Sequence, residues 1–133
     1  MKPVDLQSIE RFVRSTLGCK CPDKVFASIV IEHARLPDTG LAFTRLVIGN
    51  RLLIHILEAS TIKVTAATVS NLAKQGLAER DAKQYHRFRL VILSAHPSQQ
   101  MDDARTSFAS AIGLDDRAHL HVLDTDQLPD ALR

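Results

Sequence analysis

The first part of the chain follows the spacing of an amphipathic helix. Between Asp5 and Leu17, apolar residues recur every three or four positions, and Gly18 then supplies a natural helix end. Pro22 is expected to open a single helical turn shortly afterwards. The inward stripe of the predicted helix consists of Leu6, Ile9, Phe12, Val13 and Leu17.

The rest of the chain alternates between strand and helix signals. Helical spacing runs from Thr65 to about Gln84, and Gly76 inside it is expected to bend the helix or pack closely on a neighbour. A third helix is expected behind Pro97, with Ser98 as its cap and Gly113 at its end. Runs of β-branched and apolar residues predict strands at Ile29–Ile31, Phe43–Ile48, Leu52–Glu58, Phe88–Ala95 and His119–Leu123.

The order of these elements predicts an α/β fold. From the N-terminus, the order is helix, three strands, helix, strand, helix and strand. Strands joined by the tight turn Gly49-Asn50 pair antiparallel, whereas the strand–helix–strand unit from Phe88 to Leu123 should be parallel. We therefore expect a single domain over residues 1–133, with a mixed sheet of about five strands covered by helices. The tail from Asp124 to Arg133 is expected to be mostly irregular.

Length and composition narrow the class of protein without indicating an activity. With 45% hydrophobic and 24% charged residues, the chain resembles an ordinary globular domain, and disordered, collagen-like and disulfide-dense classes are excluded. No signal-peptide core is visible, and apolar runs such as Leu90–Leu93 are far shorter than the roughly 20 residues of a membrane span. Two cysteines fit a reducing compartment. We therefore expect a cytoplasmic protein without a membrane partner.

The formal net charge of +2 hides an uneven distribution. Residues 1–89 hold fourteen basic and eight acidic side chains, a balance of +6, whereas residues 90–133 hold three and seven, a balance of −4. Such a layout can steer a protein partner or pair two copies of the chain head to tail as a homo-oligomer. The simpler interpretation is that the C-terminal loops happen to be acidic.

Two cysteines, Cys19 and Cys21, lie one residue apart between a helix end and a proline. If Pro22 opens a helical turn, Cys21 is its cap residue, and the free backbone N–H groups together with Lys20 and Lys24 lower its thiol pKa. Both cysteines are therefore thiol or redox candidates, and Cys21 is expected to be the more acidic. A disulfide between them would close a small, strained ring. The alternative is a purely structural role, in which the two small side chains pack at a helix end.

This segment resembles a motif of small uncharacterised bacterial and archaeal proteins. The motif has the form Gly-Cys-x-Cys-Pro, an acidic residue, one variable residue and Val-Phe. The resemblance covers the first helix and the motif, and it implies no activity and no residue role. The matching stretch here is Gly18-Cys19-Lys20-Cys21-Pro22-Asp23-Lys24-Val25-Phe26.

Two cysteines do not complete a metal site, because structural zinc is usually held by four Cys or His ligands. His119 and His121 are alternate residues of one predicted strand and share a face, so together with Cys19 and Cys21 they would form a zinc site. The competing interpretation buries the residues between them and turns both histidines outward.

His96 and Ser98 lie between the end of a predicted central strand and the start of a helix. Ligands of open α/β sheets bind at such carboxyl ends of strands, where helix N–H groups favour anions. Both residues are therefore candidates for a small-anion site, with an ordinary capped loop as the alternative. The sequence has no glycine-rich loop of the Walker or dinucleotide type.

The densest basic cluster lies around the end of the second predicted helix and includes two aromatic residues. Such clusters contact phosphates and stack on bases. A solvated helix end is the simpler explanation. The nucleic-acid candidates in this cluster are Arg80, Lys83, Arg87 and Arg89.

The order helix, three strands, helix, strand is also similar to the core of the restriction-endonuclease-like nucleases. In that family, an acidic residue on the second strand and an acidic-x-Lys triplet on the third hold magnesium. Glu58 lies at the matching end of the third predicted strand, but Ser60 stands in place of the lysine. Asp38 lies in the turn before the second strand, not on it. The resemblance therefore implies a nucleic-acid-binding relative without an intact catalytic site.

Three functions stay open at this point. The preferred one is a small binding or accessory domain in which Cys19 and Cys21 form a reactive-thiol or metal-contacting motif. The second is a nucleic-acid-binding domain of nuclease-like architecture, and the third is a thiol-dependent enzyme. The Gly-x-Ser-x-Gly and His-Glu-x-x-His motifs of hydrolases and metalloproteases are absent.

Overall fold

The computed structural model describes residues 6–20, 22–36, 40–59 and 65–133. Within these residues, five strands form one mixed sheet in the order β1-β2-β3-β4-β5. β1, β2 and β3 pair antiparallel, whereas β3, β4 and β5 are parallel. The predicted fold class and all predicted strands are confirmed. Their bounds are β1 (Ile29–Arg35), β2 (Ala42–Ile48), β3 (Leu52–Glu58), β4 (Arg87–Ser94) and β5 (Ala118–Asp124).

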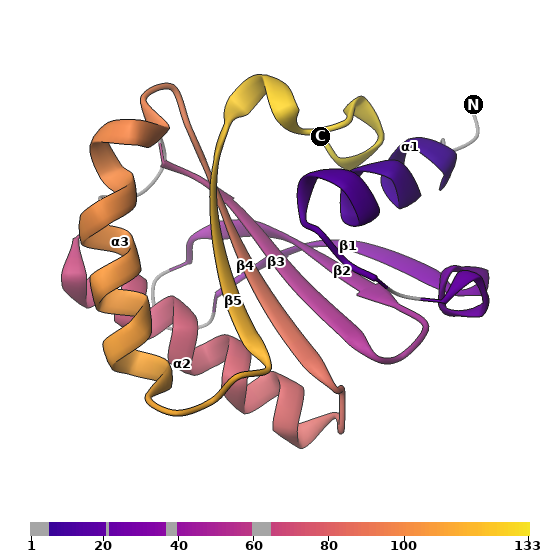
Figure 1. The fold of residues 1–133 in the computed structure, drawn as a ribbon, viewed down its shortest axis with the longest axis horizontal. Helices are drawn as coiled ribbons and strands as arrows, with labels where there is room; N and C mark the ends of the chain where they lie inside the picture. The colour runs from indigo at the N-terminus through magenta and orange to yellow at the C-terminus, as the bar shows by residue number, and fades with distance from the viewer. Residues whose placement is uncertain (1–5, 21, 37–39, 60–64) are drawn as a thin grey trace.

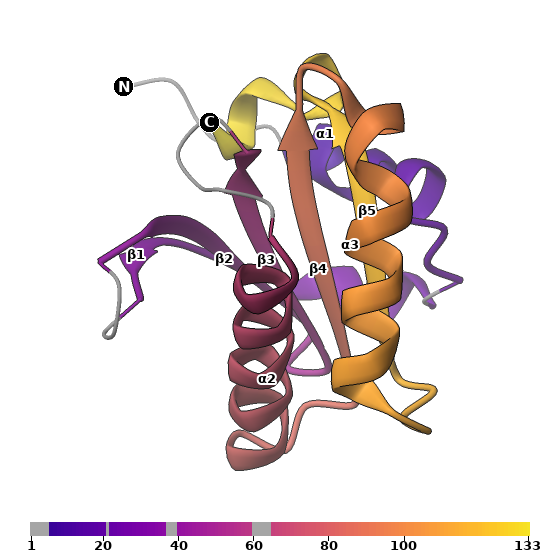
Figure 2. The same ribbon diagram turned by 90° about the vertical axis from the view of Figure 1, so that its left-hand side faces the viewer.

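Helices cover both faces of this sheet (Figures 1 and 2). The α-helices are α1 (Leu6–Arg11), α2 (Ala66–Ala82) and α3 (Pro97–Ile112). Helices α2 and α3 lie side by side on one face, and α1 lies on the other together with the C-terminal turns. Shorter helical segments are the π-helical η1 (Phe12–Thr16), which continues α1, and the 3₁₀ segments η2 (Asp23–Ala27), η4 (Thr125–Gln127) and η5 (Asp130–Leu132).

Strand β4 is covered on both faces, as its continuous apolar run predicts. Phe88 and Leu90 are buried in the core beneath α2 and α3, whereas Val91 and Leu93 pack into the core beneath α1. Gly76 of α2 packs directly on Phe88, because a Cβ at this glycine would lie 2.0 Å from the ring atom Cζ. The prediction that this glycine allows close packing is therefore confirmed.

Two predictions about helix starts are wrong. Leu6 is the first residue of α1 and is 50% exposed, so it does not belong to the buried stripe. Ser98 does not cap α3, since the helix already begins at Pro97 with His96 at the N-cap and no side-chain cap bond. Proline suits this first position because it has no N–H to leave unpaired.

The C-terminal tail is also more ordered than predicted. Asp124 and Gln127 form a capping box that starts η4, in which each side chain accepts a backbone N–H of the segment. Leu128 and Leu132 are buried in the same core as the helix α1. The tail therefore helps to cover the α1 face of the sheet.

Candidate functional site

A basic cavity of about 370 Å³ lies at the amino-terminal ends of β3 and β4. We call it the Cys19 cavity. Its lining residues Cys19, Val25 and Leu52 belong to the core beneath α1, which places the cavity on that side of the sheet. Aspartate and glutamate are absent from the described residues that line it. Its charged or titratable wall consists of Lys20, Arg51, His86, Arg87 and Arg89.

Backbone hydrogen bonds bring two parts of this wall together. The N–H groups of His86 and Arg87 both donate to the carbonyl of Arg51, at 2.8 and 3.1 Å. Arg87 also pairs with Leu52 in the parallel register of β3 and β4. The turn between β2 and β3 is thereby tied to the start of β4, and the cationic side chains of these distant segments meet at one opening.

Cys19 reaches the cavity from the end of η1. Its N–H donates to the carbonyl of Val13 at 3.0 Å, and the preceding Gly18 adopts a positive φ of +73° that glycine tolerates. Cys19 is 7% exposed and is disulfide-bonded. Segment η2 has Pro22 at its N-cap, so the prediction that Cys21 caps this turn is wrong. Cys21 itself lies outside the described residues.

Arg89 is the buried cation of the Cys19 cavity. It is 8% exposed, and its Nη1 donates to the carbonyl of Leu17 at 2.8 Å and lies 2.9 Å from Nε2 of His121. Its Nε has no hydrogen-bond partner among the described residues. Burial and the nearby charge of Arg87 lower the pKa of Arg89. A buried charge that lacks a counter-ion is unfavourable, so this position favours a bound anion.

Arg89 contacts two of the segments that carry the predicted zinc ligands. Arg89 bonds both Leu17, two residues before Cys19, and His121. A guanidinium cation at this point repels a divalent metal ion. In the part of the chain that the structure describes, no group of three or more His, Cys, Asp or Glu side chains could hold a metal. Zinc at Cys19, Cys21, His119 and His121 stays a prediction.

The charge of Arg89 also affects the pKa values of the two histidines of β5, His119 and His121. Burial and the charges of Arg89 and His119 lower the pKa of His121 to about 4. Burial, together with Arg89 and Arg87, also lowers the pKa of His119. His119 and His121 are both partly buried on β5.

The four predicted nucleic-acid residues do not share one surface. Arg80 is 2% exposed, and its Nη1 donates to Oδ1 of Asp115 at 2.9 Å, which removes it from the accessible surface. Lys83 and Arg87 are exposed, whereas Arg89 is buried in the Cys19 cavity. The structure therefore divides a cluster that is continuous in the sequence.

The predicted small-anion residues lie at the other end of the parallel strands. His96 and Ser98 are exposed at the carboxyl end of β4, and neither lines the Cys19 cavity. The N–H of His96 donates to Oγ of Ser94 at 3.0 Å. A small-anion site here stays a prediction. Of the residues compared with the nucleases, Glu58 is exposed at the end of β3, and Ser60 and Asp38 lie outside the described residues.

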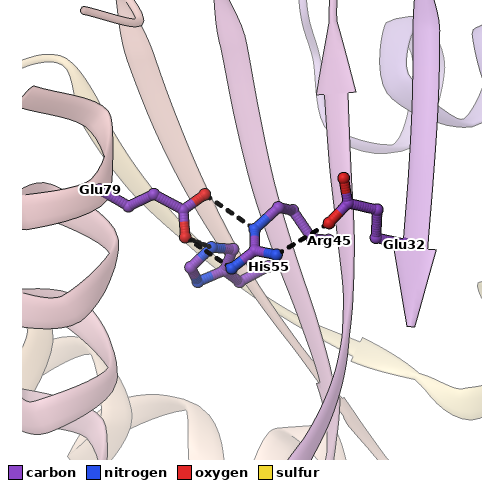
Figure 3. A network of polar contacts seen from close by, with 4 residues as sticks. All are labelled: Glu32, Arg45, His55 and Glu79. Carbon is purple, nitrogen blue, oxygen red and sulfur yellow. Dashed lines mark hydrogen bonds and ion pairs between the residues drawn. The ribbon is translucent and has the colours of Figure 1, made fainter. Parts of the chain in front are cut away.

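A polar network that sequence reasoning missed connects the sheet to α2 (Figure 3). Nε and Nη2 of Arg45 donate to the two carboxylate oxygens of Glu79, each at 2.8 Å, and Nη1 donates to Glu32 at 3.1 Å. Nε2 of His55 lies 3.4 Å from the same Glu79 carboxylate. Burial alone would raise the pKa of Glu79, but hydrogen bonds and charges from His55 and Arg45 outweigh it and lower that pKa to about 2.

His55 is the buried member of this network, at 3% exposure. Its ring packs between Phe43 and Phe88, with centroids 4.8 and 5.1 Å away. Arg45 and His55 lie opposite each other in the antiparallel register of β2 and β3. Nothing local in the sequence indicates that Glu79 joins them. Arg45 and Glu79 carry opposite charges that pair with each other. The charge of Arg89, in contrast, is not paired with any carboxylate of the described residues.

Comparisons with known proteins supply no precedent for the cavity. No protein-family model matches the chain, and no curated protein or solved structure is significantly similar to it. Among the residues that the structure describes, none of the helices has both the length and the apolar character that a bilayer crossing requires. Function is therefore argued from the geometry of the cavity.

Proposed function

We propose that this protein is a small binding domain that holds an anionic ligand in the Cys19 cavity. Arg89 carries the proposal, because it lines the cavity at 8% exposure and its Nε lacks a hydrogen-bond partner among the described residues. Buried charges in proteins are normally paired. A phosphate or carboxylate group would pair this guanidinium, and guanidinium binds both groups with two parallel hydrogen bonds.

The exposed cations around Arg89 support the same proposal. Lys20, Arg51 and Arg87 form no ion pair within the described residues, whereas Arg45 and Arg80 are both held by carboxylates. Several positive charges around a cavity attract an anion from a distance and raise its association rate. The rim would therefore collect the ligand, and Arg89 would hold its charged group.

The cytoplasm is the location we propose, because a chain with only two cysteines lacks the dense disulfide framework of small secreted domains. There the domain would act through binding, as an accessory protein that retains or delivers an anion. The basic wall also contains Arg87 and Arg89 of the cluster that predicted nucleic-acid binding. Nucleic acid is therefore tested as the competing ligand.

Thermal unfolding in the presence of inorganic phosphate tests the proposal. A ligand that binds only the folded state raises the melting temperature with its concentration. We expect phosphate to stabilise the wild type more than sodium chloride of equal ionic strength does. Arg89→Met should abolish this gain, and Arg51→Ala on the exposed rim should weaken phosphate binding by about tenfold.

Arg105→Ala is the matched control, because Arg105 is exposed on α3 on the opposite face of the sheet and its loss changes the net charge equally. If phosphate stabilises the wild type and the three variants equally, the proposed site is contradicted. A short single-stranded oligonucleotide is titrated in parallel. Tight binding that falls steeply with salt, and that Arg89→Met leaves intact, would instead favour nucleic acid as the ligand.

A further inference from the structure

We infer that the anion of the Cys19 cavity is a small anionic thiol or its disulfide, and that Cys19 exchanges disulfide bonds with it. This inference rests on the proposed anion site. Two independent observations meet in one cavity. Cys19 is disulfide-bonded, and the same wall contains the buried guanidinium of Arg89, whose Nε has no hydrogen-bond partner among the described residues. A ligand that carries both a carboxylate and a sulfur would use both features.

The charge of the cavity suits this chemistry. Thiol–disulfide exchange proceeds through thiolates, and neighbouring cations lower the pKa of a thiol. Lys20, Arg87 and Arg89 line the cavity together with Cys19, and no carboxylate of the described residues lies in that lining. The cations would stabilise both the attacking thiolate and the thiolate that leaves.

A purely structural role explains this disulfide less well. The fold has two extensive apolar cores, one on each face of the sheet, and each buried apolar side chain contributes roughly 1.5–3 kcal/mol. Disulfides of cytoplasmic proteins are usually transient and catalytic or redox-sensing. Cys19 lines the cavity, from which a second sulfur would approach its disulfide, as exchange requires.

The exchange balances without a further reactant. The ligand thiolate attacks the Cys19 sulfur, a new S–S bond forms, and the electron pair of the old bond leaves with the sulfur that was bonded to Cys19. A second ligand thiolate then attacks the ligand sulfur of the mixed disulfide and releases the Cys19 thiolate. Two ligand thiols become one disulfide, the protein disulfide gains two electrons, and the two protein thiolates take up the two protons. The reverse sequence reduces an anionic disulfide.

The test compares disulfides of similar size and different charge. Reduced Cys21→Ser protein, which keeps Cys19 as its only thiol, reacts with dithiodiglycolate, which is anionic, or with bis(2-hydroxyethyl) disulfide, which is neutral. Mixed disulfide is quantified by mass spectrometry after acid quenching. The rate ratio, anionic over neutral, is divided by the same ratio for N-acetylcysteinamide. This normalised ratio reports electrostatic selection, because a change in thiol reactivity alters both rates together.

We expect the normalised ratio to be about tenfold or more for the folded protein. Arg87→Ala and Arg89→Met should each lower it severalfold, and Arg105→Ala should leave it within about twofold. Phosphate at constant ionic strength should slow the anionic reagent selectively. If Cys21→Ser does not fold, reduced wild type is used and the adduct at Cys19 is identified by peptide mass.

A normalised ratio near one, or a Cys19 that reacts with neither reagent, would overturn the inference. If phosphate still stabilises the wild type in an Arg89-dependent manner, the anion site survives and only the thiol ligand is lost. If phosphate neither stabilises the protein nor slows the anionic reagent, the proposed function fails as well. The two failures are therefore distinguishable.

Discussion

Nη1 of Arg89 lies 2.9 Å from Nε2 of His121 on the neighbouring strand. A guanidinium has only donors, so this contact requires His121 to accept through a neutral ring whose proton is on Nδ1. The same Nη1 donates to the carbonyl of Leu17. The contact couples β5 to β4 and to the end of η1, and it holds Arg89 in the wall of the Cys19 cavity.

Protonation of His121 should therefore weaken the fold in mild acid. The folded pKa of about 4 lies below the ordinary value of 6.5. Between these pH values the unfolded chain binds a proton that the native ring does not, so stability falls as the pH falls through this window. His121→Gln keeps an acceptor without titrating. We expect its free energy of unfolding to fall less than that of the wild type between about pH 7 and about pH 4.5, by about 1–3 kcal/mol.

Urea unfolding at a series of pH values measures this difference. The matched control is His86→Gln, since His86 is exposed on the cavity rim. Parallel curves for wild type and His121→Gln would contradict the assignment of a neutral, proton-resistant ring.

The Arg45–Glu79 pair should stabilise the attachment of α2 to the sheet. Glu79→Gln removes the charge that Arg45 and His55 surround, and we expect a loss of about 2 kcal/mol in the free energy of unfolding near neutral pH. Glu79→Gln, Arg45→Met and the double variant form a double-mutant cycle, for which we expect a coupling energy of about 1–2 kcal/mol. Additive single effects would show that the two side chains do not stabilise each other.

The same pair predicts a second pH effect with a known sign. The folded pKa of Glu79 is lowered from 4.5 to about 2. Its contribution is fully present above the ordinary value and is lost as the pH falls from there towards 2. Glu79→Gln should therefore be less stable than the wild type at neutral pH, and the difference should shrink in strong acid.

Gly76→Ala should destabilise the protein although alanine is the better helix former by about 1 kcal/mol. The added Cβ would lie 2.0 Å from Cζ of Phe88, which sits at 0% exposure in the centre of the core. We expect a net loss of about 1–3 kcal/mol from overpacking. Adding Phe88→Leu should recover part of it, measured by thermal or urea unfolding. A more stable Gly76→Ala protein would show that α2 can shift away from the sheet.

The fold should not depend on the two cysteines. Replacing both, as Cys19→Ser with Cys21→Ser, should lower the melting temperature by only a few degrees relative to the reduced wild type, as a loss of about 1 kcal/mol does in a domain of this size. The two apolar cores motivate this expectation. Circular dichroism and thermal unfolding check it, and an unfolded double variant would make the pair structural.

The types and order of the helices and strands follow from local sequence patterns. Strand alternation, helical spacing and turn residues involve only a few neighbouring positions. These patterns can therefore be recognised in the sequence without knowledge of the tertiary structure. Thr65 therefore marks the start of α2, where its hydroxyl accepts the N–H of Thr68, and the continuous run of β4 indicates cover on both faces. Gly76 in the helix interior also indicated a bend or a close contact, because a helix interior rarely keeps glycine without a reason, but only the structure shows that the neighbour is Phe88.

Which charges are available to a ligand depends on how distant segments pack in the folded protein. Arg80 and Arg87 lie seven positions apart in one basic run, yet Arg80 is neutralised by Asp115 and Arg87 lines the Cys19 cavity. A charge is paired or free according to the groups that surround it in space, and those groups come from distant segments. Arg51, from the turn before β3, joins Arg87 because backbone hydrogen bonds hold their segments together. Local patterns had singled out Cys19, Arg87 and Arg89, but none indicated that the three residues share one cavity at the amino ends of the parallel strands.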